Sequence, residues 1–386
     1  MIFKRIELGI VVFILFAAQI PLRAGSIVTD LPKRIYVENN EKSSHVQGVA
    51  VDTKRGYAYF SFTTKLIKTD LYGHLIGSVT GLTCHLGCID LDTETGKLYA
   101  SIEYKDDEIG RGILQQMGRQ LGKRENTFYI GIFNTDKITS PNISAESGDV
   151  MKTVSLPEVV KMYEDSVFCN GHLTAHHYGC SGIDGIALGP QFGKTNGKSF
   201  LNVDVAIYGD TTRHDNDYQL LLQFDPRKIE KWALPLDQNR PHHSGPPHAA
   251  QRYFIYTGNT SYGIQNLKYD PSSHFWFAAV YPGHKTQFHN FQLFAIDGTK
   301  KPVKQILRSD KPEKAHVLSL AETGCQGYQQ DIYGWDFNLG STGIAAIGNG
   351  LFYISHNGST KQGHQFCDLR LYKWTGNAEK PFEEVK

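Results

Sequence analysis

Hydrophobic and polar residues alternate along most of this chain in short runs, and one such run occurs twice near the start. The stretches SSHVQGVAVDTKRGYAYFSF (43–62) and TCHLGCIDLDTETGKLYASIEY (83–104) each contain an apolar segment, a polar turn with glycine and a second segment rich in aromatic residues. Aligning His45 with His85 also aligns the aspartate, the glycine and the tyrosine that follow. Short alternating runs that are rich in β-branched and aromatic residues predict β-strands. Their recurrence about 40 residues later indicates a repeat architecture.

Three weaker copies of the pattern follow, at 181–190, 262–281 and 341–357. Each copy leads into further strand-like segments, so the chain reads as five units of four strands. This pattern predicts an all-β fold, a β-propeller of four-stranded antiparallel blades with five blades. The unequal spacing of the copies leaves six or seven blades open, and a β-sandwich or two smaller β domains are the alternatives.

Individual strands can be assigned to most blades. We expect the segment 231–237 (KWALPLD) to end the third blade and the segment 303–309 (VKQILRS) to end the fourth. An early strand at 33–39 (KRIYVEN) precedes the first unit. It can pair with the last blade and close the ring, which would remove two exposed sheet edges.

The N-terminus has a basic start and an apolar run over 8–18, followed by small residues. This pattern predicts a signal peptide over 1–24 and a single propeller domain over 25–386. The expected location is therefore secreted or periplasmic, with an uncleaved membrane anchor as the alternative. No later segment is apolar over 18 residues, so we expect no membrane span in the mature chain.

Six cysteines agree with an oxidising compartment. The pairs that we consider plausible are Cys169–Cys180 and Cys325–Cys367. Cys84 and Cys88 are held too far apart to pair with each other by four residues of extended chain, and buried free thiols are expected there.

The charge is balanced, with 40 basic and 39 acidic residues. Such a chain has no overall field to hold nucleic acid or an anionic membrane, so we expect neither as a partner. We expect a monomer that binds a carbohydrate or another polar small molecule.

The loops on the two faces of the predicted propeller differ in length, and long loops on a rigid scaffold commonly carry function. The first strands of the blades begin on the long-loop face, around the central channel. The polar or aromatic residues at these strand mouths are His45, Gln47, His85, Asp184, Tyr262, Gln265 and Thr342. A ring of such side chains can hold a metal or a polar ligand. Alternatively, they hydrate the channel or cap strand ends.

The loop GDTTRHDND (209–217) adds Arg213 and His214 to this face. Its many oxygen ligands, together with Asp184, are compatible with Ca²⁺, although solvated acidic turns explain the loop equally well. Asp90, Glu103 and Asp184 are candidates for a pair of catalytic carboxylates, and no spacing singles out two of them.

The strand mouths SHVQG and TCHLG, together with RHDNDYQ, resemble secreted propeller enzymes that act on carbohydrate, including propeller polysaccharide lyases. In those lyases a histidine or tyrosine serves as base and acid, and an arginine neutralises a uronate carboxylate. The resemblance implies a polysaccharide lyase or glycoside hydrolase in which His45 and His85 transfer protons and Arg213 holds an acidic group. His214, Tyr262, Gln47 and Gln265 would bind the sugar.

Two other functions remain open on this sequence. One is a propeller without catalytic activity that binds a glycan or a protein on the same face. The other is a Ca²⁺-dependent hydrolase of the lactonase type, in which Asp184 holds the metal.

Overall fold

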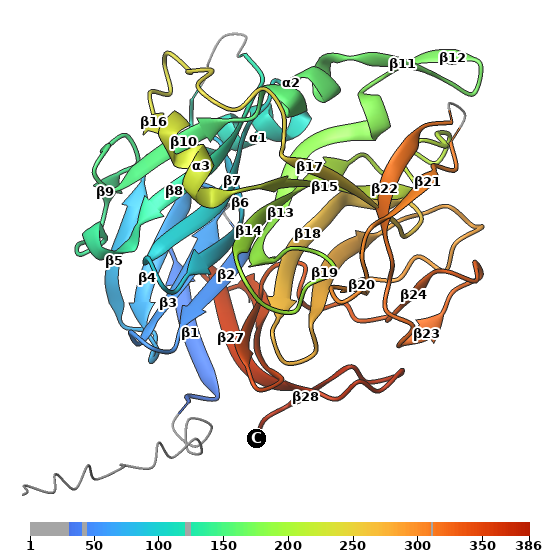
Figure 1. Ribbon diagram of the computed structural model, residues 1–386. Helices are drawn as coiled ribbons and strands as arrows, with labels where there is room; N and C mark the ends of the chain where they lie inside the picture. Colours follow the sequence, from blue (N-terminus) through green and yellow to red (C-terminus); the bar gives the residue numbers. More distant parts are fainter. Residues whose placement is uncertain (1–30, 41–44, 120–124, 310–311) are drawn as a thin grey trace, which may run out of the picture. The chain divides into compact units, whose positions relative to one another are not determined.

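The computed structural model describes residues 31–40, 45–119, 125–309 and 312–386. The predicted signal peptide, 1–24, lies outside the described residues. Strands dominate the described part, and they form five larger sheets (Figure 1). The α-helices are α1 (Glu108–Gln116), α2 (Pro157–Glu164) and α3 (Pro226–Ile229).

The first two sheets are four-stranded antiparallel meanders with one short strand added at the outer edge. Blade 1 consists of β2 (Val46–Asp52), β3 (Tyr57–Phe62), β4 (Lys65–Asp70), β5 (Leu75–Thr80) and the parallel edge strand β9 (Ile143–Ser144). Blade 2 consists of β6 (His85–Asp92), β7 (Lys97–Tyr104), β8 (Thr127–Asn134), β10 (Met151–Ser155) and the edge strand β16 (Leu234–Pro235).

The other three sheets follow the same plan with more variation. Blade 3 consists of β13 (Cys180–Pro190), β14 (Ser199–Ile207), β15 (Tyr218–Phe224) and β17 (Gln251–Tyr256), and is extended by β22 (Lys314–Leu318) and β21 (Val303–Ile306). Blade 4 has β18 (Thr260–Asp270), β19 (Phe275–Pro282) and β20 (Leu293–Asp297). Blade 5 has β25 (Ile344–Gly348), β26 (Leu351–Ser359), β27 (Gln365–Trp374), β1 (Arg34–Asn39) and β28 (Phe382–Glu384). Two small hairpins lie outside the blades, β11 (Ser166–Cys169) with β12 (His172–Ala175) and β23 (Cys325–Gln326) with β24 (Tyr333–Gly334).

The first strands of the five sheets pack side by side in a closed ring. In order, β2 packs on β6, β6 on β13, β13 on β18, β18 on β25, and β25 on β2. The early strand β1 pairs antiparallel with β27, as Figure 1 shows, with Arg34 opposite Arg370 and Asn39 opposite Gln365. The prediction of a five-bladed propeller that is closed by an N-terminal strand is confirmed.

The short turns between the first and second strands are built by local side-chain hydrogen bonds. In blade 1, Asp52 Oδ1 accepts from the backbone N–H groups of Lys54 and Arg55, and Gly56 closes the turn with a φ of 77°. Asp92 has the same role in blade 2. Such aspartates satisfy a turn's backbone donors, so the repeated aspartate and glycine in the sequence correspond to one repeated structural unit.

Two of the predicted outer strands are assigned to the wrong blade. The segment 231–237 contributes β16, which pairs with β10 of blade 2, and the fourth strand of blade 3 is instead β17. The segment 303–309 contributes β21, which joins blade 3 through β22 rather than completing blade 4. In both cases the segment pairs with a strand of another blade, and the local sequence pattern does not indicate which blade a segment will join.

The two predicted disulfides are absent from the structure, in which no disulfide joins the six cysteines. Cys180 begins the innermost strand of blade 3, where its Sγ lies 3.9 Å from the carbonyl oxygen of Gly182. Cys367 is buried in β27 with its Sγ 3.2 Å from Ser355 Oγ, whereas Cys325 is exposed. Cys325 and Cys367 therefore lie in different environments, one exposed and one buried.

Candidate functional site

The innermost strands of the five blades share a residue pattern near the start of each strand. The equivalent apolar residues Val46, Leu86, Ile183, Ile264 and Ile344 are all fully buried. In the first four of these strands the pairing register shifts beside this residue. Such bulges redirect side chains at the rim of a sheet and are frequent next to functional sites. The residues that follow the apolar position in three of the blades, Gln47, Asp184 and Gln265, thereby reach the mouth of the channel.

A pocket of about 400 Å³ lies at this mouth. Its volume falls in the range of roughly 300–1,000 Å³ that is typical of small-molecule sites. The lining includes seven residues that the sequence singled out, namely His45, Gln47, His85, Glu103, Asp184, Tyr262 and Gln265. The structure thus brings together residues from blades 1, 2, 3 and 4. In the sequence, these residues were related only by their positions in the repeat.

His85 and Glu103 are opposite each other on β6 and β7. The Nδ1 atom of His85 lies 3.4 Å from Oε2 of Glu103, which is an ion-pair contact without an aligned hydrogen bond. The other carboxylate oxygen of Glu103 accepts a hydrogen bond of 2.6 Å from the backbone N–H of Ile183 in blade 3. Glu103 therefore holds the ring of His85 and also joins two blades.

Lys105 continues this line of charges. Its Nζ lies 3.0 Å from Oε2 of Glu103 and 3.7 Å from Oδ2 of Asp107, and it donates to the carbonyl oxygen of Ser181 over 2.8 Å. The Lys105 side chain is only 4% exposed. A buried ammonium needs such partners, because isolated charge is costly to remove from water. Sequence analysis missed Lys105, although period-two alternation along β7 places it on the same face as Glu103.

The helix α1 forms one wall of the pocket through Ile109, Gly112, Ile113 and Gln116. Its N-cap is Asp107, whose Oδ1 accepts from the backbone N–H of Gly110 and whose Oδ2 accepts from the hydroxyl of Tyr208. A Cβ atom at Gly110 would lie 1.9 Å from the carbonyl oxygen of Lys105, so the helix starts in close contact with β7. Sequence analysis missed this helix.

The two histidines of the pocket have pKa values displaced in opposite directions. Burial, with the nearby His85, lowers the pKa of His45, whose Nε2 lies 3.0 Å from the side-chain nitrogen of Gln47. Burial also opposes protonation of His85, but Glu103 and Asp184 outweigh it and raise the pKa of His85. The lowered pKa favours the neutral imidazole at His45, whereas the raised pKa favours the protonated form at His85.

Asp184 is another group of the pocket with a displaced pKa. Burial raises its pKa to about 7, while the nearby His85 opposes the shift. Its Oδ1 accepts a hydrogen bond of 3.1 Å from the backbone N–H of Cys88. Within the described residues, no group of three or more His, Cys, Asp or Glu side chains is arranged to hold a metal ion. Binding of Ca²⁺ by Asp184 stays a prediction, and we derive no reaction step from it.

The structure places Arg213 and His214 outside the pocket lining. Arg213 is buried and binds both carboxylate oxygens of Asp215, at 2.8 and 2.9 Å, as well as the carbonyl oxygens of Ala175 and His176. His214 is exposed. Arg213 therefore fastens its own loop to the base of the β11–β12 hairpin.

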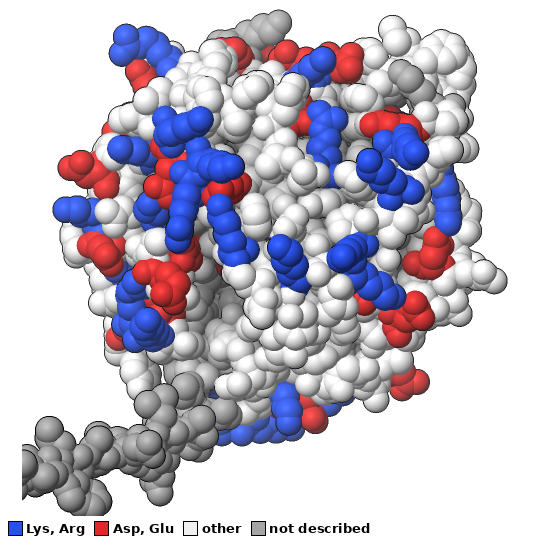
Figure 2. Space-filling model, in the orientation of Figure 1, with Lys and Arg blue, Asp and Glu red and all other residues white. Residues whose placement is uncertain are grey.

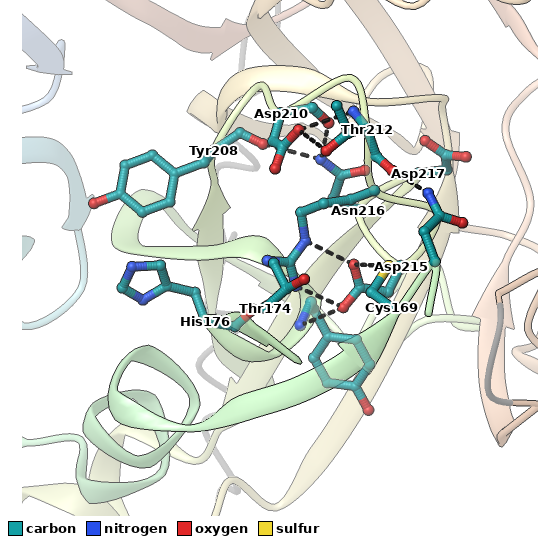
Figure 3. Close-up of polar contacts among 12 residues, drawn as sticks. Cys169, Thr174, His176, Tyr208, Asp210, Thr212, Asp215, Asn216 and Asp217 are labelled. Carbon is teal, nitrogen blue, oxygen red and sulfur yellow. Dashed lines mark hydrogen bonds and ion pairs between the residues drawn. The ribbon is translucent and has the colours of Figure 1, made fainter. Parts of the chain in front are cut away.

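The remaining carboxylates of this loop are also engaged. Lys285, which follows β19, contacts Asp217 Oδ1 at 2.5 Å and Asn216 Oδ1 at 2.8 Å. Figure 3 shows Asp210, Thr212, Asp215, Asn216 and Asp217 gathered in one network of polar contacts. The protein's own cations thus neutralise Asp215 and Asp217, two of the acids whose number had suggested Ca²⁺.

A cluster of polar contacts joins the innermost strands next to residues that line the pocket. The Nδ2 group of Asn266 donates to the carbonyl oxygens of Gln47 and Ser341, at 2.8 and 2.9 Å. Its Oδ1 lies 3.5 Å from the Sγ of Cys88, which also lies 3.5 Å from the carbonyl oxygen of Ile186. Each of these five residues comes from a different blade, so the cluster ties the innermost strands together.

Asp90 does not line the pocket. Its Oδ1 lies 2.6 Å from Lys268 Nζ, and its Oδ2 accepts from the backbone N–H of Leu188. This candidate for a catalytic carboxylate pair therefore joins blades 2, 3 and 4 instead.

Comparisons with known proteins add little to the description of this chain. No family model matches the chain, and no curated protein matches its sequence. One similar solved structure is the β-propeller domain of Cps50 (Swd1) from Myceliophteria thermophila, with 9% identity and a TM-score of 0.32, covering 83% of this chain and 82% of that chain. This similarity is too low to support an argument about function.

Two further observations bear on the expected partners, one on surface charge and one on the helices. Basic and acidic side chains are interspersed on the face drawn in Figure 2. In the part of the chain that the structure describes, no helix is long and apolar enough to cross a membrane.

Proposed function

We propose that this protein cleaves glycosidic bonds by acid–base catalysis in the pocket at the channel mouth. The observation that carries the proposal is the pair of imidazoles on one pocket, His45 and His85, with pKa values displaced in opposite directions. Titratable groups whose surroundings separate their pKa values in this way are suited to serve as base and acid in one reaction.

In the proposed reaction, His45 takes a proton from a water molecule as that water attacks the anomeric carbon. His85 gives its proton to the glycosidic oxygen as the bond from carbon to that oxygen breaks. The net result is addition of water across the bond, with the two histidines exchanging protonation states until solvent resets them. Glu103 orients His85, and Gln47, Gln265 and Tyr262 are placed to bind sugar hydroxyls.

Hydrolysis is favoured over elimination by the placement of Arg213. Elimination from a uronate requires a cation that neutralises the substrate carboxylate, and Arg213 is committed to Asp215. The cationic groups that do line the pocket, His85 and Lys105, are already balanced by Glu103 and Asp107.

The test is turnover of a panel of neutral and acidic oligosaccharides and aryl glycosides by the purified protein. New reducing ends report hydrolysis, and new ultraviolet absorbance of unsaturated products reports elimination. His45→Ala and His85→Ala should each reduce the rate by about 10²–10⁴-fold, the usual contribution of general acid–base transfer. His74→Ala, which removes an exposed imidazole far from the pocket lining, is the matched control.

Three results would correct the proposal. Undiminished turnover in the double variant His45→Ala/His85→Ala would place catalysis elsewhere. Unsaturated products would replace hydrolysis by elimination. No turnover across the panel, with the fold intact, would favour a glycan-binding propeller without catalytic activity.

A further inference from the structure

The two sides of the pocket differ in chemistry. The innermost strands contribute hydrogen-bonding and charged groups, among them His45, Gln47 and Gln265. The helix α1 contributes Ile109, Gly112 and Ile113, and among the described residues of this helix that line the pocket, Gln116 is the polar one. A ligand that fills this pocket therefore meets polar groups at one end and an apolar wall at the other.

The wall has open space at Gly112. A Cβ atom added there would meet no atom within 4 Å, although Gly112 lines the pocket. The neighbouring Gly110 is different, because its missing side chain is required by contact with the carbonyl oxygen of Lys105. Packing within the protein does not require a glycine at 112, and the space beside it is open to a ligand.

Tyr262 adds an aromatic surface at the rim. Its side chain is 41% exposed, which is high for a large aromatic residue, and it lines the pocket. Its backbone has a φ of 66°, an uncommon conformation for a tyrosine, and its carbonyl oxygen accepts a hydrogen bond of 2.8 Å from Gln265 Nε2. Unusual backbone conformations that surrounding contacts maintain are concentrated at ligand sites.

We propose that the pocket binds a glycoside with an apolar aglycone. The sugar lies on the polar floor, and the aglycone lies against α1 at Gly112 and beside Tyr262. The sugar half of this inference rests on the proposed function, whereas the aglycone half rests on the wall of α1. Apolar surface that leaves water for such a wall gains affinity in proportion to the area buried.

The experiment compares equilibrium binding of methyl and phenyl β-glycosides, and of the matching α-glycosides, for glucose, galactose, xylose and N-acetylglucosamine. Titration calorimetry on the full protein measures affinity without any need for turnover. For the sugar that binds, the phenyl glycoside should bind about 10-fold tighter or more than the methyl glycoside. In Gly112→Leu, which fills the open space, the ratio of the two affinities should fall to about one. Gln115→Leu adds the same side chain at an exposed position of the same helix and should keep the ratio.

The outcomes separate this inference from the proposed function. Equal binding of phenyl and methyl glycosides overturns the aglycone site, whatever the turnover results are. An unchanged ratio in Gly112→Leu overturns its location. No binding of any glycoside in the panel overturns the inference as a whole. A phenyl preference that disappears in Gly112→Leu supports it, even if no variant or wild-type protein shows turnover, in which case catalysis alone is refuted.

Discussion

Replacing Asn266 by leucine should destabilise the whole propeller, because this one amide joins three blades directly. Leucine has nearly the shape of asparagine, so the change leaves the packing similar and removes only the polar groups. The carbonyl oxygens of Gln47 and Ser341 would lose their donor, the first in a buried site and the second in a partly buried one. The thiol of Cys88 would lose one acceptor but keep the carbonyl oxygen of Ile186.

The magnitude follows from the two carbonyl groups. A buried acceptor that loses its only donor costs about 1–3 kcal/mol. The better burial of leucine offsets part of this cost, so we expect a loss of about 2–5 kcal/mol in the free energy of unfolding. Urea unfolding, followed by the fluorescence of the four tryptophans, measures it.

A matched control is available in Asn202, which is also fully buried, on β14 of blade 3. Its Oδ1 accepts one hydrogen bond from Gln223, while its Nδ2 is buried without a partner. Asn202→Leu therefore loses one bond and also removes one unsatisfied donor, and its net cost should be at most about 1 kcal/mol. Equal effects of the two substitutions would refute the reasoning that the axial amide closes the ring.

Three further predictions follow from the pocket. Gly112→Ala should raise the free energy of unfolding by up to about 1 kcal/mol, because alanine favours helix. Gly110→Ala should lower it, because the added Cβ atom collides with the carbonyl oxygen of Lys105. Thermal unfolding of the two variants measures both effects. The pH profile of kcat/KM should be bell-shaped, with its maximum between the lowered pKa of His45, which must be neutral, and the raised pKa of His85, which must be protonated. In His45→Ala the acidic limb should disappear. The pKa of Asp184 is raised to about 7 from an ordinary value of 3.8. This shift contributes stability that is present below pH 4 and lost as the pH rises through 7, by up to about 4 kcal/mol. Asp184→Asn should therefore flatten the pH dependence of the free energy of unfolding, as urea unfolding at pH 4–8 will show.

The sequence predicts those parts of the fold that local repetition encodes. The innermost strands, their aspartate turns and the closing strand at 33–39 follow from periodicity and from the repeated motif. The outer strands at 231–237 and 303–309 could not be placed, because their partners are set by long connections and by packing on another blade. Strand pairing over long sequence separations is not visible in a local pattern.

The candidate site could likewise be predicted only in part from the sequence. Gln47, Asp184 and Gln265 occupy equivalent positions in three of the repeats. They meet in the pocket because the repeats are arranged around a common axis. Lys105 and the wall of α1 belong to an insertion that occurs in one blade only, so no repeat could reveal them. Arg213 has the residue type that the resemblance requires, yet its partner Asp215 lies two residues away and takes up its charge.

The charged groups of the pocket also close the propeller, and this determines which substitutions can test chemistry. Glu103 accepts from the backbone of blade 3, and Asp184 of blade 3 accepts from the backbone of blade 2. Loss of activity in variants of these carboxylates would therefore combine a chemical effect with loosened contacts between blades. His45 differs, because its ring contacts the side chain of Gln47 in its own blade. His45→Ala should consequently change the rate and its pH dependence while leaving the unfolding free energy nearly unaltered, and a variant that loses stability and activity together would show that His45 supports the fold rather than the reaction.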